Sequence, residues 1–133
     1  MSFASTGAKS HSAELLHVGR YIPLATNDSF LFTAKTFSSL SSRKVDVYNI
    51  NSGGQLEKYR EISSPKPMSG DDFGFSIAAS EKHLLIGAPG YNDGHGIAYL
   101  YELKDNIWKL VKTYENPVSY QDKGYPHKFG YNV

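Results

Sequence analysis

The sequence contains no cysteine. Disulfide bonds, thiolate catalysis and cysteine-bearing zinc sites are therefore excluded, although metal sites built from histidine or carboxylate groups remain open. No segment approaches the roughly 20 consecutive apolar residues of a membrane-spanning helix, and the N-terminal residues lack the apolar core of a secretory signal. We therefore expect no membrane insertion, and a location in the cytoplasm or within a viral or other particle.

The sequence also lacks a large net charge: its 14 Lys and Arg residues and 13 Asp and Glu residues leave a formal net charge of +1. A chain with this balance has no long-range field to gather nucleic acid, so a nucleic-acid partner is not expected. What the sequence does contain is ten Tyr, seven Phe and twelve Gly among 133 residues. This composition favours strands and turns over charged helices, and it predicts an all-β fold of one domain.

Two series of four strand-like segments follow one another along the chain, separated by turn-forming residues. The second series is the clearer one, with segments at 73–80 (FGFSIAAS), 83–89 (HLLIGAP), 96–103 (GIAYLYEL) and 108–115 (WKLVKTYE). The first series has segments at 18–25 (VGRYIPLA), 29–35 (SFLFTAK), 44–50 (KVDVYNI) and 55–62 (QLEKYREI). A period of this length is the sequence signature of a repeat architecture.

Alignment of the two series gives offsets that drift from 55 to 52 residues: Val18-Gly19 with Phe73-Gly74, Phe32–Ala34 with Ile86–Ala88, Val47-Tyr48 with Leu100-Tyr101, and Leu56 with Trp108. The C-terminal residues FGYNV, 129–133, repeat FGFSI, 73–77, at an offset of 56 residues. The chain is therefore predicted to contain two units and the first strand of a third.

Four antiparallel strands per unit, with each unit covering its neighbour, are the plan of a β-propeller blade. The predicted organisation is an irregular N-terminal arm at 1–17, blade 1 at 18–72, blade 2 at 73–128 and the start of a further blade at 129–133. Leu84, Leu85 and Ile86 are apolar on both faces, which predicts an inner strand between neighbouring blades, whereas 55–62 alternates and predicts an outer, more hydrated strand.

The second unit closely resembles the FG-GAP repeat of propellers of the integrin α-subunit type. The residues that carry this resemblance form the structural motif Phe73, Gly74, Gly87, Ala88, Pro89 and Gly96, and the pair Phe129 and Gly130 begins the motif again. The resemblance implies blades of a seven-bladed propeller, often extracellular, that binds proteins or glycans through loops on one face. It also implies calcium in some blades.

The sequence departs from this family in two respects. The connections that hold calcium in the family are AASEKH, with only Glu81, and LATNDS, with adjacent Asn27 and Asp28, so too few oxygen ligands converge and neither calcium nor another cofactor is expected. Two units are also too few to close a ring. We therefore expect the fold to be completed by other copies or by another chain, unless the chain is a fragment of a longer propeller.

The candidate binding residues lie in two loops. The segment 90–96 (GYNDGHG) contains Tyr91, Asn92, Asp93 and His95 beside flexible glycines, and the inter-blade segment 115–128 contains Tyr120 and Tyr125. Tyrosine rings and side-chain oxygens at such loops suit protein or sugar contacts, although an ordinary strand connection accounts for the same residues.

No set of residues in the sequence suggests catalysis. Ser76 follows Gly74 but lacks the final glycine of a nucleophile elbow, and the five histidines show no paired metal spacing. We therefore expect no enzymatic activity. Our hypothesis is a non-catalytic protein-binding or structural assembly module, with a protein partner or self-association. Two alternatives stay open: a lectin-like carbohydrate-binding module in an oligomeric ring, using Trp108 or Tyr91, and a fragment of a larger adhesion-type propeller.

Overall fold

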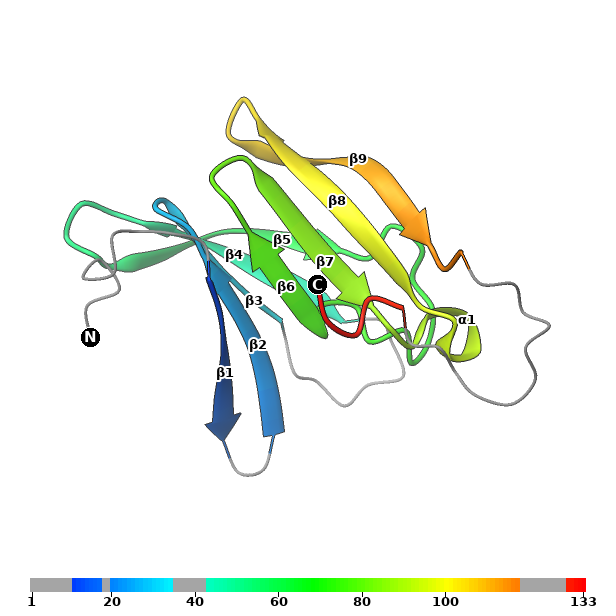
Figure 1. Ribbon diagram of the computed structural model, residues 1–133. Coiled ribbons are helices and arrows are strands. Elements are labelled where there is room, and N and C mark those ends of the chain that lie inside the picture. The colour runs from blue at the N-terminus through cyan, green and yellow to red at the C-terminus, as the bar shows by residue number, and fades with distance from the viewer. Residues whose placement is uncertain (1–10, 18–19, 35–42, 118–128) are drawn as a thin grey trace.

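The computed structural model describes residues 11–17, 20–34, 43–117 and 129–133, with side chains described from residue 23 onward. It consists of two antiparallel sheets that lie against each other (Figure 1). The first sheet contains β1 (His11–His17), β2 (Arg20–Thr26), β3 (Phe30–Ala34), β4 (Lys44–Ile50) and β5 (Leu56–Ser63). The second contains β6 (Ser76–Ala79), β7 (His83–Ala88), β8 (Ile97–Lys104) and β9 (Ile107–Glu115), with the short turn α1 (Tyr91–Gly94) between β7 and β8. The all-β prediction and the two sets of four antiparallel strands are confirmed.

Strand β1 is the main addition to the predicted organisation. The sequence pattern places residues 11–17 in an irregular arm, but they pair with β2 from His11 opposite Thr26 to His17 opposite Arg20. The first sheet therefore has five strands and the second has four. A hairpin partner satisfies backbone groups that an irregular arm would leave to water, and the apolar pair Leu15 and Leu16 gave too weak an alternation to indicate it.

The strand registers show that the two sheets repeat at a constant interval. Ala25, Phe32 and Val47 lie opposite one another across β2, β3 and β4, and Ala78, Leu85 and Leu100 do so across β6, β7 and β8, 53 residues later in each case. A β-bulge falls after Val47 in the first sheet and after Leu100 in the second. The drifting alignment is therefore corrected at β3 and β7, where Phe32 corresponds to Leu85 and not to Ile86. A slip of one residue matters because successive side chains point to opposite faces.

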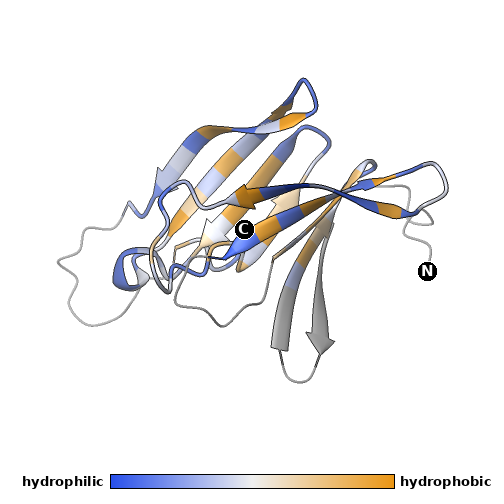
Figure 2. Cartoon of the chain, turned by 180° about the vertical axis from the view of Figure 1, so that it is seen from behind, coloured by the Kyte–Doolittle hydropathy of each residue, from blue (hydrophilic) through white to orange (hydrophobic). Residues whose placement is uncertain are grey.

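The core lies between the sheets, and its residues alternate along each strand. The first sheet contributes Ala25, Phe30, Phe32, Ala34, Val45, Val47 and Ile62, and the second contributes Ile77, Ala79, Leu84, Ile86, Ala88, Ile97, Tyr99, Tyr101 and Trp108. Figure 2 shows the apolar segments on the middle strands and the hydrophilic hairpin tips. As predicted, β5 is mostly exposed. β7 differs from the prediction, because Leu84 and Ile86 are fully buried while Leu85, on its other face, is only half-buried.

Residues 129–133 were expected to begin a third blade. They do not form a strand, and Phe129 instead makes an isolated parallel bridge with Gly96, the residue before β8, in the part of the chain that the structure describes. The segment lies beside the second sheet, near the end of β7 (Figure 1). The C-terminal Phe-Gly pair is therefore docked on the second sheet, where it forms part of the candidate site.

Candidate functional site

The loop before β6 is held in shape by a buried carboxylate. Asp71 is 1% exposed, and its Oδ1 accepts a hydrogen bond from the backbone N–H of Phe73 at 3.1 Å while its Oδ2 accepts one from Met68 at 3.2 Å. Its carbonyl oxygen accepts the N–H of Gly90 at 3.0 Å, which ties this loop to the turn after β7. Asp71 therefore acts as a structural residue of the loop.

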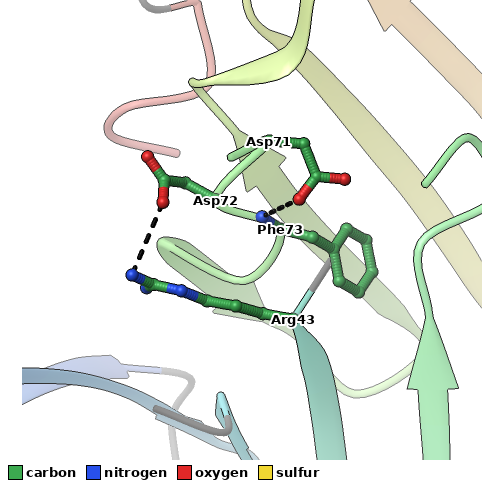
Figure 3. A network of polar contacts seen from close by, with 4 residues as sticks. All are labelled: Arg43, Asp71, Asp72 and Phe73. Atoms are coloured by element: carbon green, nitrogen blue, oxygen red, sulfur yellow. Dashed lines mark hydrogen bonds and ion pairs between the residues drawn. The ribbon is translucent and has the colours of Figure 1, made fainter. Parts of the chain in front are cut away.

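The neighbouring carboxylate points in a different direction. Asp72 forms an ion pair with Arg43, with 3.4 Å between Nη2 and Oδ1, so the loop of the second sheet is linked to the residue before β4 (Figure 3). Both side chains are partly exposed, at 30% and 40%. Pairs with this exposure contribute little to stability, so Asp72 orients the loop more than it stabilises the fold.

Phe73 and Gly74 dock on the first sheet through the end of β3 and the start of β4. Gly74 has a left-handed backbone with φ of +84°, and a Cβ at this position would come within 2.9 Å of Val45 Cγ2 and 3.0 Å of Ala34 Cβ. Phe73 is fully buried and its ring lies 5.8 Å from that of Tyr99. Glycine is required here both for its conformation and for the close approach. We call Ala34 and Val45 the first seat.

Phe129 and Gly130 dock on the second sheet at the matching place. The equivalents of Ala34 and Val45, 53 residues on, are Gly87 and Ala98. Gly130 also has a left-handed backbone, with φ of +86°, and an added Cβ would lie 2.6 Å from the carbonyl oxygen of Ile97 and 3.2 Å from Gly87 Cα. The Phe-Gly pair thus makes the same kind of contact twice, each time with the sheet that precedes it in the chain.

The second seat consists of Ser76, Gly87, His95 and Gly96. Ser76 Oγ donates a hydrogen bond to the carbonyl oxygen of Gly130 at 2.6 Å, and the carbonyl oxygen of His95 accepts the N–H of Phe129 at 3.2 Å. A Cβ on Gly87 would overlap the carbonyl oxygen of Gly130, and one on Gly96 would overlap the backbone of Phe129. This seat is therefore lined by backbone where the first is lined by side chains. Ser76 is a strand residue with a structural hydrogen bond.

The remaining residues of the motif, Ala88 and Pro89, directly follow Gly87 of the second seat. Ala88 is fully buried in the core, and Pro89 follows it into the turn. A side chain at Gly90 would overlap the carbonyl oxygen of Gly70. The motif glycines Gly74, Gly87, Gly96 and Gly130 all lie where a second backbone segment or a neighbouring side chain approaches too closely for a Cβ.

The predicted binding loop 90–96 is a short helical turn. Asn92 and Asp93 are exposed with left-handed backbones, at φ of 50° and 56°, so their side chains are available to solvent. Tyr91 is half-buried and packs against the core, and the His95 backbone serves the second seat. The structure thus places these four residues beside the second seat, while their role in binding stays a prediction. Tyr120 and Tyr125 lie outside the described residues.

Trp108 differs from the expectation that it could form a sugar-binding surface. It is 7% exposed, and its ring packs edge-on against Phe30 and Phe32, with centroids 5.5 and 5.3 Å apart. It is therefore a core residue that joins β9 to β3. The sequence did not indicate this, because a single Trp at the start of a predicted strand gives no sign of which face it occupies.

Two tyrosines in the core of the second sheet, Tyr99 and Tyr101, have raised pKa values. Burial raises the pKa of Tyr99 and of Tyr101 above their ordinary range, and the nearby Ser64 hydroxyl acts against this shift at Tyr99. Among the described residues, Tyr101 Oη and Trp108 Nε1 are buried without a hydrogen-bond partner. These rings fill the space between the sheets, and both tyrosines are held in the neutral form.

One face of the second sheet remains uncovered in its outer part. We define this open face by Ala78, Leu85, Leu100, Lys112 and Tyr114, which the strand register places on the side opposite the core. The three aliphatic residues are half-buried and Tyr114 is 39% exposed, with Lys112 Nζ 5.4 Å from the centre of its ring. In the first sheet the equivalents Ala25, Phe32 and Val47 are all fully buried by the second sheet.

The part of the chain that the structure describes contains no group of three or more His, Asp or Glu residues arranged to hold a metal ion. In the same residues, none of the helices has the length and apolar character needed to cross a membrane.

Comparison with protein families identified an FG-GAP repeat in residues 61–101. The matched segment begins at the end of β5 and extends into β8, so it contains the loop held by Asp71, the first Phe-Gly pair and the Gly87–Pro89 turn. Comparisons with curated proteins and with solved structures gave no significant match. Residues 61–101 therefore form an FG-GAP repeat, as the resemblance predicted.

Proposed function

We propose that this chain, which contains an FG-GAP repeat in residues 61–101, is a non-catalytic assembly module that binds a further copy of itself through its open face. The observation that carries the proposal is a difference between equivalent positions. Ala25, Phe32 and Val47 are fully buried by the following sheet, whereas Ala78, Leu85 and Leu100 are only half-buried. The open face of the second sheet is therefore equivalent to the face of the first sheet that the second sheet covers.

The charge and shape of the open face suit a β-sheet partner. The row Leu85, Leu100 and Lys112 repeats the row Phe32, Val47 and Arg60 of the first sheet, with a long cationic side chain at the outer end of each. Such side chains cover apolar surface with their aliphatic parts and keep the charge in water. The open face therefore has an apolar centre and a charged border, which is the usual composition of a protein interface.

Only one face of the described chain offers such a surface. On the far side of the first sheet, Leu24 and Leu31 are already buried, at 9% and 5% exposed, and Asp46 is buried between them and β5. A closed ring of identical copies would need an open apolar face on both sides of the chain. This asymmetry favours assembly at the second sheet alone.

Sedimentation velocity of the purified chain over a range of concentrations tests the proposal. We expect wild-type chains to associate and the Leu85→Glu and Leu100→Glu variants to shift toward monomer, because a buried carboxylate without a partner opposes assembly. Leu56→Glu is the matched control, since Leu56 is 46% exposed at the start of β5. A wild-type chain that stays folded, monomeric and monodisperse over the whole range would contradict the proposal.

A further inference from the structure

The docked C-terminal segment is held by contacts that recognise a particular peptide chemistry. The second seat contacts its backbone at two places: the bridge from Gly96 to Phe129, in which Phe129 donates to the His95 carbonyl, and the Ser76 hydroxyl. None of these contacts involves a side chain of the segment. They fix its path, as main-chain contacts do when an extended peptide adds to a sheet.

Selectivity comes from Gly130, the second residue of the segment. Gly130 adopts a left-handed backbone and lies against the Ile97 carbonyl, the Ala88 N–H and Gly87 Cα. A larger residue would be strained in its backbone and would also overlap the sheet. The seat therefore accepts glycine and excludes residues with a Cβ at this position.

The residue after glycine adds an aromatic contact. The ring of Tyr131 lies 4.8 Å from that of Phe75 and is tilted by 37°, while Tyr131 itself is 54% exposed. Phe75 follows the first Phe-Gly pair, so the two docked segments contact each other through their aromatic rings. The seat thus recognises an extended backbone, then glycine, then an aromatic residue.

We propose that the second seat is a peptide-binding site for an extended Gly-aromatic segment, and that residues 129–133 of a second copy can occupy it in place of the chain's own. The occupant already in the seat has this sequence, and among the described residues it is held by the Gly96–Phe129 bridge, the Ser76 hydroxyl and the ring pair of Phe75 and Tyr131. Asn116 Nδ2 also donates to the His95 carbonyl at 2.9 Å, so Asn116 and Phe129 both donate to the same carbonyl oxygen. In the sequence, twelve residues, 117–128, separate these two contacts.

This proposal does not depend on the proposed function, because it concerns one end of the second sheet, at Ser76, Gly87, His95 and Gly96, and not Leu85 or Leu100. The two can fail separately. Glutamate at Leu85 tests the open face, while substitutions at Gly130 or Tyr131 test the seat.

The test uses the full chain and a synthetic peptide of residues 127–133, HKFGYNV, which represents the segment of a second copy. Gly130→Val releases the chain's own segment, because a branched side chain would overlap the Ile97 carbonyl. Gly54→Val is the matched control: Gly54 has the same left-handed backbone, with φ of +77°, but no atom lies within 4 Å of its added Cβ. Binding is followed by the backbone amide signals of Gly87 and Gly96 in ¹⁵N-labelled protein.

We expect the peptide to bind Gly130→Val at least about tenfold more tightly than the wild type or Gly54→Val, since a seat that is more than 90% occupied lowers apparent affinity by that factor. The peptide HKFVYNV should leave both amide signals unchanged. Equal binding by Gly130→Val and Gly54→Val, or equal binding of the two peptides, would overturn the proposal.

A second variant covers the case in which Gly130→Val does not fold. Tyr131→Ala removes an exposed side chain and its contact with Phe75, and leaves the seat itself intact. This variant should bind HKFGYNV several-fold more tightly than the wild type does, and should bind HKFGANV more weakly than HKFGYNV. Unchanged affinity in Tyr131→Ala would likewise refute the exchange of segments.

Discussion

Replacement of Trp108 by alanine should uncouple the two sheets and cost a large part of the free energy of unfolding. The side chain is 93% buried, as its 7% exposure shows, and it contacts Phe30 and Phe32 edge-on at 5.5 and 5.3 Å. Burial of a Trp side chain removes about 200 Å² from water, which at about 25 cal/mol per Å² corresponds to about 5 kcal/mol. Measured Trp→Ala losses of about 3–5 kcal/mol agree with this figure.

Urea unfolding followed by far-UV circular dichroism measures this loss. With an m-value of about 2 kcal/mol per M, a loss of 4 kcal/mol lowers the midpoint by about 2 M. Leu110→Ala is the control on the same strand, since Leu110 is 42% exposed, and it should cost less than about 1 kcal/mol.

Trp108→Phe separates ring packing from the indole N–H. Nε1 is buried without a partner in the described part of the chain, so phenylalanine removes a polar group that is costly to bury. We expect a loss of only about 1–2 kcal/mol, well below that of alanine. If Trp108→Ala and Leu110→Ala shifted the midpoint equally, the reasoning that Trp108 joins the sheets would be refuted.

The remaining predictions concern the adjacent carboxylates and the buried tyrosines. Asp71→Ala should lower the free energy of unfolding by about 2–4 kcal/mol, because two backbone N–H groups lose their acceptor. Asp72→Ala, which removes only a partly exposed ion pair, should cost less than about 1 kcal/mol. Thermal unfolding of the two variants side by side measures both losses, and equal losses would contradict this prediction. Stability should fall as pH rises above the ordinary tyrosine pKa of 10.0, because burial raises the pKa of Tyr99 and Tyr101 in the folded state and the unfolded chain loses these protons first. Each tyrosine contributes at most about 1.4 kcal/mol per pH unit, and Tyr101→Phe should reduce the slope measured in urea unfolding between pH 9 and pH 11; an unchanged slope would argue against this origin.

Much of the fold could be predicted because its signals are local. Strand propensity, turn residues and the Phe-Gly and Gly-Ala-Pro spacing located eight of the nine strands that the structure describes. The family assignment of the second unit was confirmed by the match over residues 61–101. These signals depend on a few neighbouring residues, so a single sequence contains them.

Features that depend on which face a side chain occupies were harder to predict. The one-residue error in the alignment of Phe32 and the position of Trp108 both depend on the face to which one side chain points. Because β7 has apolar residues on both faces, its sequence did not indicate which of them correspond to β3. β1 was missed for a related reason, because its pairing with β2 is a contact between strands and not a pattern within one. The candidate loop residues Tyr91, Asn92, Asp93 and His95 were placed beside the second seat, but the seat itself was not foreseen.

The sequence by itself determined that the chain is built from β-strands in two similar units, since alternation and glycine spacing are properties of local backbone conformation. Only the tertiary structure decided what the glycines are for. Gly74 and Gly130 each contact the sheet that precedes them, across 40 and 43 residues of chain from Ala34 and Gly87. Close approach between distant backbones is a matter of packing, and so the docked segment, the seat and the open face emerge only when the sheets lie against each other.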